Sequence, residues 1–169
     1  NIEITKQTVK YAHEKNVTVE AEVGHIGGTE DDVSAEIAYA KVEDAIKLVE
    51  ETNIDFFAPA LGSVHGLYKG EPKLDFERMN IIRHETKVPL VLHGGSGIPD
   101  QMIKKAIENG ICKININTEL QITWHEAVRK FVIENSNQYD PRKVIEAGQQ
   151  SLKQTVREKI LLLNSEGKY

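Results

Sequence analysis

Apolar and polar residues recur along the chain with two periods, one typical of helices and the other of strands. An apolar stripe at three-and-four spacing between Ala38 and Val49 predicts a helix with one buried face. Short apolar runs at 54–61 and 89–93 predict strands that are buried on both sides. A further segment, 112–117, alternates in character and predicts another strand.

The same patterns predict the remaining elements. Pro99 suits the first turn of a helix and Gly110 its C-terminal end. The other predicted elements are a β-branched strand at 17–22 and helices at 2–16, 75–86, 118–134 and 141–163. Four strands that alternate with helices predict an α/β fold with a parallel sheet, either doubly wound or part of a (β/α)8 barrel. In both folds the functional residues gather at the carboxyl ends of the strands.

Composition narrows the function classes. The 169 residues carry 21 Lys and Arg against 26 Asp and Glu, which gives a formal net charge of −5. This balance argues against a nucleic-acid or anionic-membrane partner, and no apolar stretch approaches the roughly 18 residues of a membrane span. One cysteine, Cys112, cannot form an internal disulfide, so we expect a cytoplasmic location. The chain begins at Asn1 within a helical pattern, and we expect a segment upstream of it.

Two histidines stand at or just beyond neighbouring strand ends, and each is followed by glycine. Because neutral imidazole is a common metal ligand, His65 and His93 are candidates for one metal site. Packing histidines are the competing interpretation. A catalytic zinc takes three protein ligands, and for the third place Glu22 and His25 stay open.

Glycine-rich segments supply two further candidates. The turn 94–97 leads into a helix, whose first backbone N–H groups can hold a phosphate. Polar groups of Asn115, Asn117 and Thr118 follow the next strand. The acidic loop 27–32 is either a surface loop or a mobile lid that brings a carboxylate over the site.

Five segments together resemble a known family. They are 19–24, 27–32, 62–66, 92–97 and 113–118. In this order they resemble the class II, metal-dependent ketose-bisphosphate aldolases, and the resemblance runs from the first residue to about residue 167. It implies that residues 1–169 form the C-terminal part of one (β/α)8 barrel domain, about four βα units plus C-terminal helices.

The resemblance assigns roles in metal binding and proton transfer. His65 and His93 match two of three zinc-binding histidines, and Glu22 matches a glutamate of an alternative, more buried metal position. Glu30 matches a mobile-loop glutamate that removes a proton from dihydroxyacetone phosphate. Asn115 matches an asparagine that contacts the enediolate. Zinc is the implied cofactor, and a monovalent cation is a further candidate.

Other matching residues concern the phosphates. Those that match the seat of the dihydroxyacetone phosphate group are Gly66, Gly94, Ser96, Asn117 and Thr118. Asn117 departs from relatives that carry Asp there. Arg142 matches an arginine that reaches the other phosphate from a neighbouring subunit, which implies a homo-oligomer, a dimer or a tetramer.

The implied activity is reversible cleavage of fructose 1,6-bisphosphate into dihydroxyacetone phosphate and glyceraldehyde 3-phosphate. The expected partners are therefore small sugar phosphates. The third zinc histidine and a catalytic aspartate are expected upstream, so we expect the chain alone to be inactive. Tagatose 1,6-bisphosphate is an alternative substrate, and a non-catalytic sugar-phosphate or metal-binding protein on the same scaffold is an alternative function. An unrelated phosphate-binding domain is a third, weaker interpretation.

Overall fold

The computed structural model describes residues 1–30, 33–35 and 39–168, and these divide into two compact units. The first unit is Asn1–Asn115 and the second is Ile116–Tyr169. None of the described helices is long and apolar enough to cross a membrane.

The first unit is built on a parallel sheet with the strand order β1-β4-β6-β7. Its strands are β1 (Glu20–Val23), β4 (Phe56–Pro59), β6 (Leu90–Leu92) and β7 (Ile111–Ile114). The side chains of β6 and Phe57 are fully buried, and burying each large apolar side chain contributes about 1.5–3 kcal/mol. All four strands were predicted from the sequence, within a few residues at their ends.

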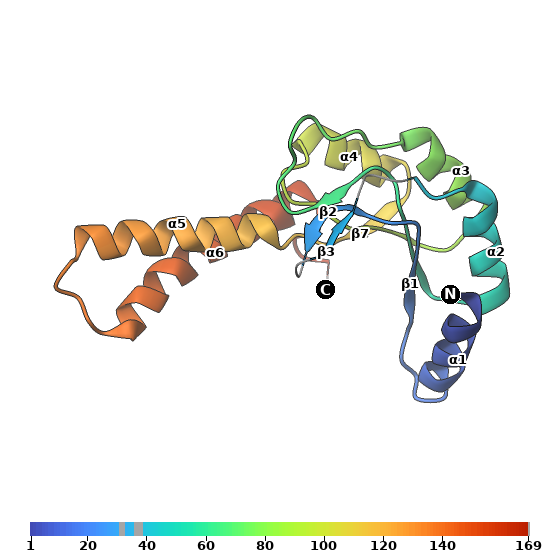
Figure 1. Cartoon of the computed structure of the whole chain (residues 1–169), viewed down its shortest axis with the longest axis horizontal. Helices are drawn as coiled ribbons and strands as arrows, with labels where there is room; N and C mark the ends of the chain where they lie inside the picture. Colours follow the sequence, from blue (N-terminus) through green and yellow to red (C-terminus); the bar gives the residue numbers. More distant parts are fainter. Residues whose placement is uncertain (31–32, 36–38, 169) are drawn as a thin grey trace. The chain divides into compact units, whose positions relative to one another are not determined.

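Helices cover this sheet in chain order, and Figure 1 shows them following one another along it. They are α1 (Ile2–His13), α2 (Val42–Thr52), α3 (Phe76–Thr86) and α4 (Asp100–Glu108), with contacts between each consecutive pair. The helices contribute buried side chains to the core, among them Leu48, Met79, Ile82 and Ile103. The α1 helix ends earlier than the predicted residue 16, because the chain turns through Asn16 at a φ of 55°.

A small second sheet in this unit was not predicted. It has the order β3-β2-β5, with β2 (Gly27–Glu30), β3 (Val33–Ala35) and β5 (Val64–His65). Residues 27–30, predicted as part of a loop, thus pair parallel with β5 and antiparallel with β3. Sequence patterning misses such strands, because two to four residues are too few to show a period.

The second unit is a pair of antiparallel helices, α5 (Thr118–Glu134) and α6 (Pro141–Leu162), as predicted within one residue. Glu119 pairs with Lys159 at 2.7 Å, and Thr123 lies 3.4 Å from the Thr155 hydroxyl, which fixes the antiparallel register. Gly148 lies directly against the indole of Trp124, where a Cβ atom would collide. The glycine therefore permits the close approach of the two helices.

Candidate functional site

Three of the predicted site residues lie at the carboxyl edge of the parallel sheet. Glu22 belongs to β1, His93 directly follows β6, and Asn115 directly follows β7. The carboxyl ends of parallel strands meet at one edge of a sheet, so strands far apart in sequence bring these side chains to one place. His93 is the centre of the contacts there.

His93 is held between two carboxylates. Its Nε2 lies 2.9 Å from Glu20 Oε1, and its Nδ1 lies 3.3 Å from Glu22 Oε2. The hydrogen bond with Glu22 raises the pKa of His93 above its ordinary value; burial opposes this rise, and Glu20 adds to it. The imidazole is therefore oriented on both of its nitrogens.

The pKa of Glu20 shifts in the opposite direction. Burial alone would raise it, but hydrogen bonds from Lys113 and His93 outweigh burial and place the pKa of Glu20 below its ordinary value. Lys113 Nζ lies 2.8 Å from Glu20 Oε2 and 2.9 Å from Asn115 Oδ1. A continuous polar chain thus runs from His93 to Asn115.

His65 comes from the small sheet, yet its ring stacks on that of His93, with centroids 6.1 Å apart and planes inclined by 26°. The Tyr68 hydroxyl ties their two loops together: it accepts from the Val64 N–H at 3.1 Å and donates to the Gly94 carbonyl at 2.9 Å. Gly94 has a φ of 66°, and a Cβ atom there would collide with the Val64 carbonyl. The structure therefore brings both predicted histidines together.

The glycine turn after β6 was predicted to offer backbone N–H groups to a phosphate. One of them is engaged, because the Gly95 N–H donates to the Asn115 carbonyl at 2.9 Å. Ser96 is buried and follows directly, ahead of α4. Gly66, directly after His65, has a φ of 85°. Of the predicted phosphate contacts in this unit, Gly66 and Gly94 flank the two histidines in sequence.

The backbone of β2, at the start of the predicted acidic loop, lies next to His65. Gly28 is in register with His65, and a Cβ atom at Gly28 would collide with the His65 carbonyl. Glu30 ends β2, but its side chain lies outside the described part of the chain, as do residues 31–32. The backbone of β2 therefore links the predicted base to the histidine site.

The donors near His93 match the chemistry of zinc. Two imidazoles and the Glu22 carboxylate are nitrogen and oxygen ligands of the kinds that zinc takes, and an ion at Nδ1 of His93 would replace the proton that Glu22 now contacts. Within the described residues no group of three such side chains converges as a complete metal cluster. The residues present fit part of a zinc site.

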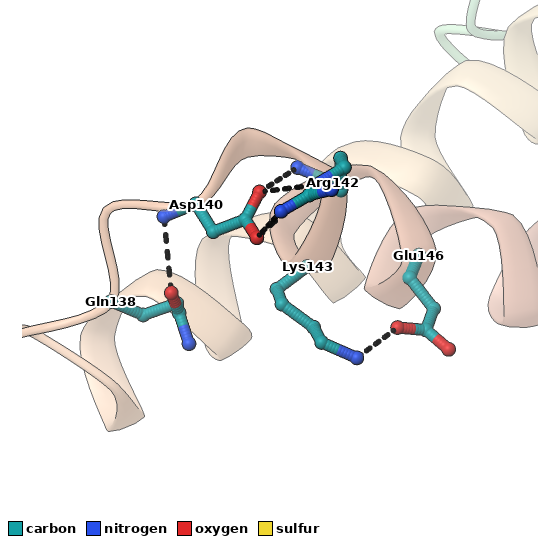
Figure 2. A network of polar contacts seen from close by, with 5 residues as sticks. All are labelled: Gln138, Asp140, Arg142, Lys143 and Glu146. Carbon is teal, nitrogen blue, oxygen red and sulfur yellow. Dashed lines mark hydrogen bonds and ion pairs between the residues drawn. The ribbon is translucent and has the colours of Figure 1, made fainter.

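The remaining predicted residues belong to the second unit. Asn117 precedes α5 without a capping hydrogen bond from its side chain, and Thr118 is the first residue of that helix. Arg142 lies at the start of α6, where its guanidinium makes a two-pronged contact with Asp140, with Nη2–Oδ2 and Nε–Oδ1 distances of 2.8 and 3.0 Å (Figure 2). Asp140 also caps the helix, accepting from the Arg142 N–H at 3.0 Å.

Arg142 nevertheless remains open to a ligand. Its side chain is 87% exposed, so the guanidinium stays accessible although one edge of it contacts Asp140. Lys143 pairs with Glu146 one turn further along the same helix (Figure 2). The start of α6 thus presents a fixed arginine at the surface.

Sequence reasoning missed two residues of the polar chain, Glu20 and Lys113. Each stands two positions before a predicted site residue, Glu20 before Glu22 and Lys113 before Asn115. Since side chains two apart on a strand face the same side, this spacing was the signal available in the sequence. The extended strand β1 carries both glutamates to His93.

Comparison with known proteins agrees with this geometry. Residues 1–168 match the family described as fructose-bisphosphate aldolase class-II. A fructose-bisphosphate aldolase of Geobacillus stearothermophilus is 53% identical over 169 residues, 99% of this chain and 59% of the relative. A 6-phospho-5-dehydro-2-deoxy-D-gluconate aldolase of Shouchella clausii is 52% identical over 95% of this chain and 55% of the relative.

Solved structures give the same answer. The YdjI aldolase of Escherichia coli K12 matches 99% of this chain and 57% of its own at 39% identity, with a TM-score of 0.80. A putative fructose-1,6-bisphosphate aldolase of Coccidioides immitis matches 99% of this chain and 59% of its own at 29% identity, with a TM-score of 0.84. The α/β fold class, as later units of an aldolase barrel, is confirmed. The chain spans a little over half the length of these relatives, and it belongs to the class II fructose-bisphosphate aldolase family.

Proposed function

We propose that the protein carrying this chain is a metal-dependent aldolase that reversibly cleaves fructose 1,6-bisphosphate into dihydroxyacetone phosphate and glyceraldehyde 3-phosphate. One observation carries the proposal. His65 and His93 stack at the carboxyl edge of a parallel sheet beside Glu22, in a chain of the aldolase family. Donors of this kind suit an ion that activates a carbonyl group.

His65 and His93 are the residues of this chain that would hold the catalytic zinc ion, and Glu22 would hold the ion at an alternative, more buried position. When bound there, zinc supplies Lewis-acid chemistry by polarising the ketone of the substrate. A monovalent cation is proposed as a second ion of the site. His93 is already oriented for the task, since carboxylates contact both of its nitrogens.

Two residues act on the reacting atoms. Glu30 removes a proton from the carbon next to the ketone of dihydroxyacetone phosphate, as a general base. The Asn115 amide donates to the oxygen on which negative charge develops as that proton leaves. Support for Asn115 comes from its place directly after β7 and its fixed contact with Lys113.

The phosphate groups orient the substrate away from the bonds that change. Those that hold the dihydroxyacetone phosphate end are Gly66, Gly94, Ser96, Asn117 and Thr118. Arg142 binds the other phosphate, and its guanidinium is already aligned by Asp140. Fixed donors at both ends supply the orientation on which the reaction depends.

The proposed molecule is larger than this chain. We propose that residues 1–169 form the C-terminal part of one barrel domain, and that Arg142 reaches its phosphate from a neighbouring subunit of a homo-oligomer. The four parallel strands and the match to the aldolase family support the barrel domain. A cytoplasmic location is in keeping with Cys112, a free and exposed thiol.

A second substrate has a specific observation in its favour. The relative at 52% identity is named for 6-phospho-5-dehydro-2-deoxy-D-gluconate, which has one phosphate and, at the other end, a carboxylate. Aldol cleavage of the bond between the carbons α and β to its ketone also yields dihydroxyacetone phosphate, so the proposed proton transfer would be unchanged. The substrates differ at the end that Arg142 would bind. Tagatose 1,6-bisphosphate is not favoured by the similarity to named relatives.

The test measures dihydroxyacetone phosphate release by the full-length protein from each of the three substrates, before and after chelation and with zinc restored. We expect the highest kcat/KM for fructose 1,6-bisphosphate, loss of activity with chelator and recovery with zinc. Preference for the gluconate derivative would establish the second candidate. Zinc binding without cleavage of any substrate would instead establish the non-catalytic binding protein.

A further inference from the structure

Glu20 and Lys113 make a contact that crosses the whole parallel sheet. They lie on β1 and β7, the outer strands of the order β1-β4-β6-β7. Three steps of about 4.8 Å separate such strands in a flat sheet, where side chains stand perpendicular to the surface. Yet Lys113 Nζ lies 2.8 Å from Glu20 Oε2. The sheet therefore curves so that both side chains converge on its concave face.

This contact joins two residues of the proposed site. One oxygen of Glu20 contacts His93 Nε2 at 2.9 Å and the other contacts Lys113. Lys113 in turn donates to Asn115 Oδ1 at 2.9 Å. The bridge thus connects a proposed metal ligand, His93, to a proposed substrate-binding amide, that of Asn115.

The bridge selects which atoms of these residues face a ligand. With Nε2 donating to Glu20, the nitrogen of His93 that can coordinate an ion is Nδ1, which faces Glu22 at 3.3 Å. Because the Asn115 amide oxygen accepts from Lys113, the amide nitrogen is the end that can donate to a ligand. A donating nitrogen at Asn115 is what the proposed reaction requires, since that amide would donate to the oxygen on which negative charge develops.

Stability alone is a poor reason for this bridge. The Lys113 side chain is 47% exposed, and ion pairs at such exposure contribute little to folding. A pair of the same kind and length, Lys6–Glu51 at 2.8 Å, joins α1 and α2 and contacts no residue of the proposed site. It offers a matched control for the loss of an exposed ion pair.

We propose that Glu20 and Lys113 are positioning residues, which fix the coordinating nitrogen of His93 and the donating end of Asn115. The proposal rests on the aldolase function and the zinc site proposed above. It predicts that Glu20 acts mainly on metal binding and Lys113 mainly on the orientation of the substrate oxygen, while each of the two side chains also holds the other in place.

The experiment uses the full-length protein with Glu20→Gln, Lys113→Met or both, beside the controls Glu51→Gln and Lys6→Met. Zinc affinity is measured by competition with a chelator, without substrate, and kcat and KM are measured separately. We expect Glu20→Gln to weaken zinc binding about 10- to 100-fold. We expect Lys113→Met to lower kcat by up to about 100-fold with a smaller change in KM, and Lys113→Arg to recover part of it.

The double variant tests whether the two residues form one unit. Its loss in kcat/KM should be smaller than the product of the single losses. Zinc affinity of Glu20→Gln equal to that of the controls, or kcat of Lys113→Met equal to theirs, would overturn the inference. If Glu20→Gln does not fold, Glu20→Asp and Lys113→Met still decide it.

Failure of the proposed function has a different signature. If the protein without substitutions binds zinc but cleaves no substrate, the aldolase activity is refuted. The zinc affinities of the Glu20 variants would still test the role of Glu20. An active unchanged protein with unaffected variants would refute the positioning roles alone. An unchanged protein that binds no zinc would overturn both.

Discussion

The Tyr68 hydroxyl joins the loops that carry the two histidines. It accepts from the backbone next to His65 and donates to the carbonyl next to His93. Burial raises the pKa of Tyr68, so the phenol stays neutral and keeps its proton for Gly94. Tyr68 therefore acts on the site through its hydrogen bonds, which hold the two loops together.

Tyr68→Phe keeps the ring and removes this bridge. Two partly buried backbone groups then lose a partner, at a cost of about 1–3 kcal/mol. We expect hydrogen exchange at 64–66 and 93–97 to rise about tenfold or more, and zinc affinity to fall about tenfold. Tyr39→Phe, which removes a hydrogen bond to the Lys73 carbonyl, is the control and should change neither. Equal behaviour of the two variants would contradict the role given to Tyr68.

At the scale of elements, the helix pair α5 and α6 depends on one small residue. Gly148 contacts the Trp124 indole, while Thr155 and the Glu119–Lys159 pair bind the helices nearer their other ends. Glycine costs about 1 kcal/mol of helix propensity relative to alanine, so its presence within α6 is explained by packing.

Gly148→Ala should therefore destabilise the pair although it improves helix propensity. The added methyl group overlaps the indole, and overpacking costs about 1–3 kcal/mol. Hydrogen exchange of α5 and α6 in the full-length protein is expected to accelerate. Gly70→Ala, where nothing lies within 4 Å of the added carbon, is the control for an added methyl group that meets no neighbour. Slower exchange in Gly148→Ala would show that propensity outweighs the overlap.

At the scale of the molecule, the described residues hold only part of a metal site. A catalytic zinc takes three protein ligands, and no group of three converges among the residues described. We expect residues 1–169 expressed alone to show no cleavage of fructose 1,6-bisphosphate, and the full-length protein to show it. The assay is dihydroxyacetone phosphate release at equal concentrations. Chelator-sensitive cleavage by the chain alone would contradict this expectation.

Much of the fold was open to sequence reasoning. The strands β4 and β6 are continuous apolar runs, and α5 and α6 are long periodic segments with clear ends, such as Asp140-Pro141. The small sheet could not be read in this way, because β5 has two residues and its partner β2 is rich in glycine. Pairing between them depends on the approach of Gly28 to His65, which only the folded chain supplies.

The candidate site, too, was predicted only in part from the sequence. By itself the sequence determined the parallel α/β order, the family, and the positions of His93, Glu22 and Asn115 at the ends of the parallel strands, since these depend on local periodicity and motif spacing. Tertiary structure alone decided that Glu20 and Lys113 meet across four strands and orient two of those residues. The reason is curvature: a pattern along the chain fixes which side of a strand a residue faces, but the bending of the sheet fixes which residues on that side touch.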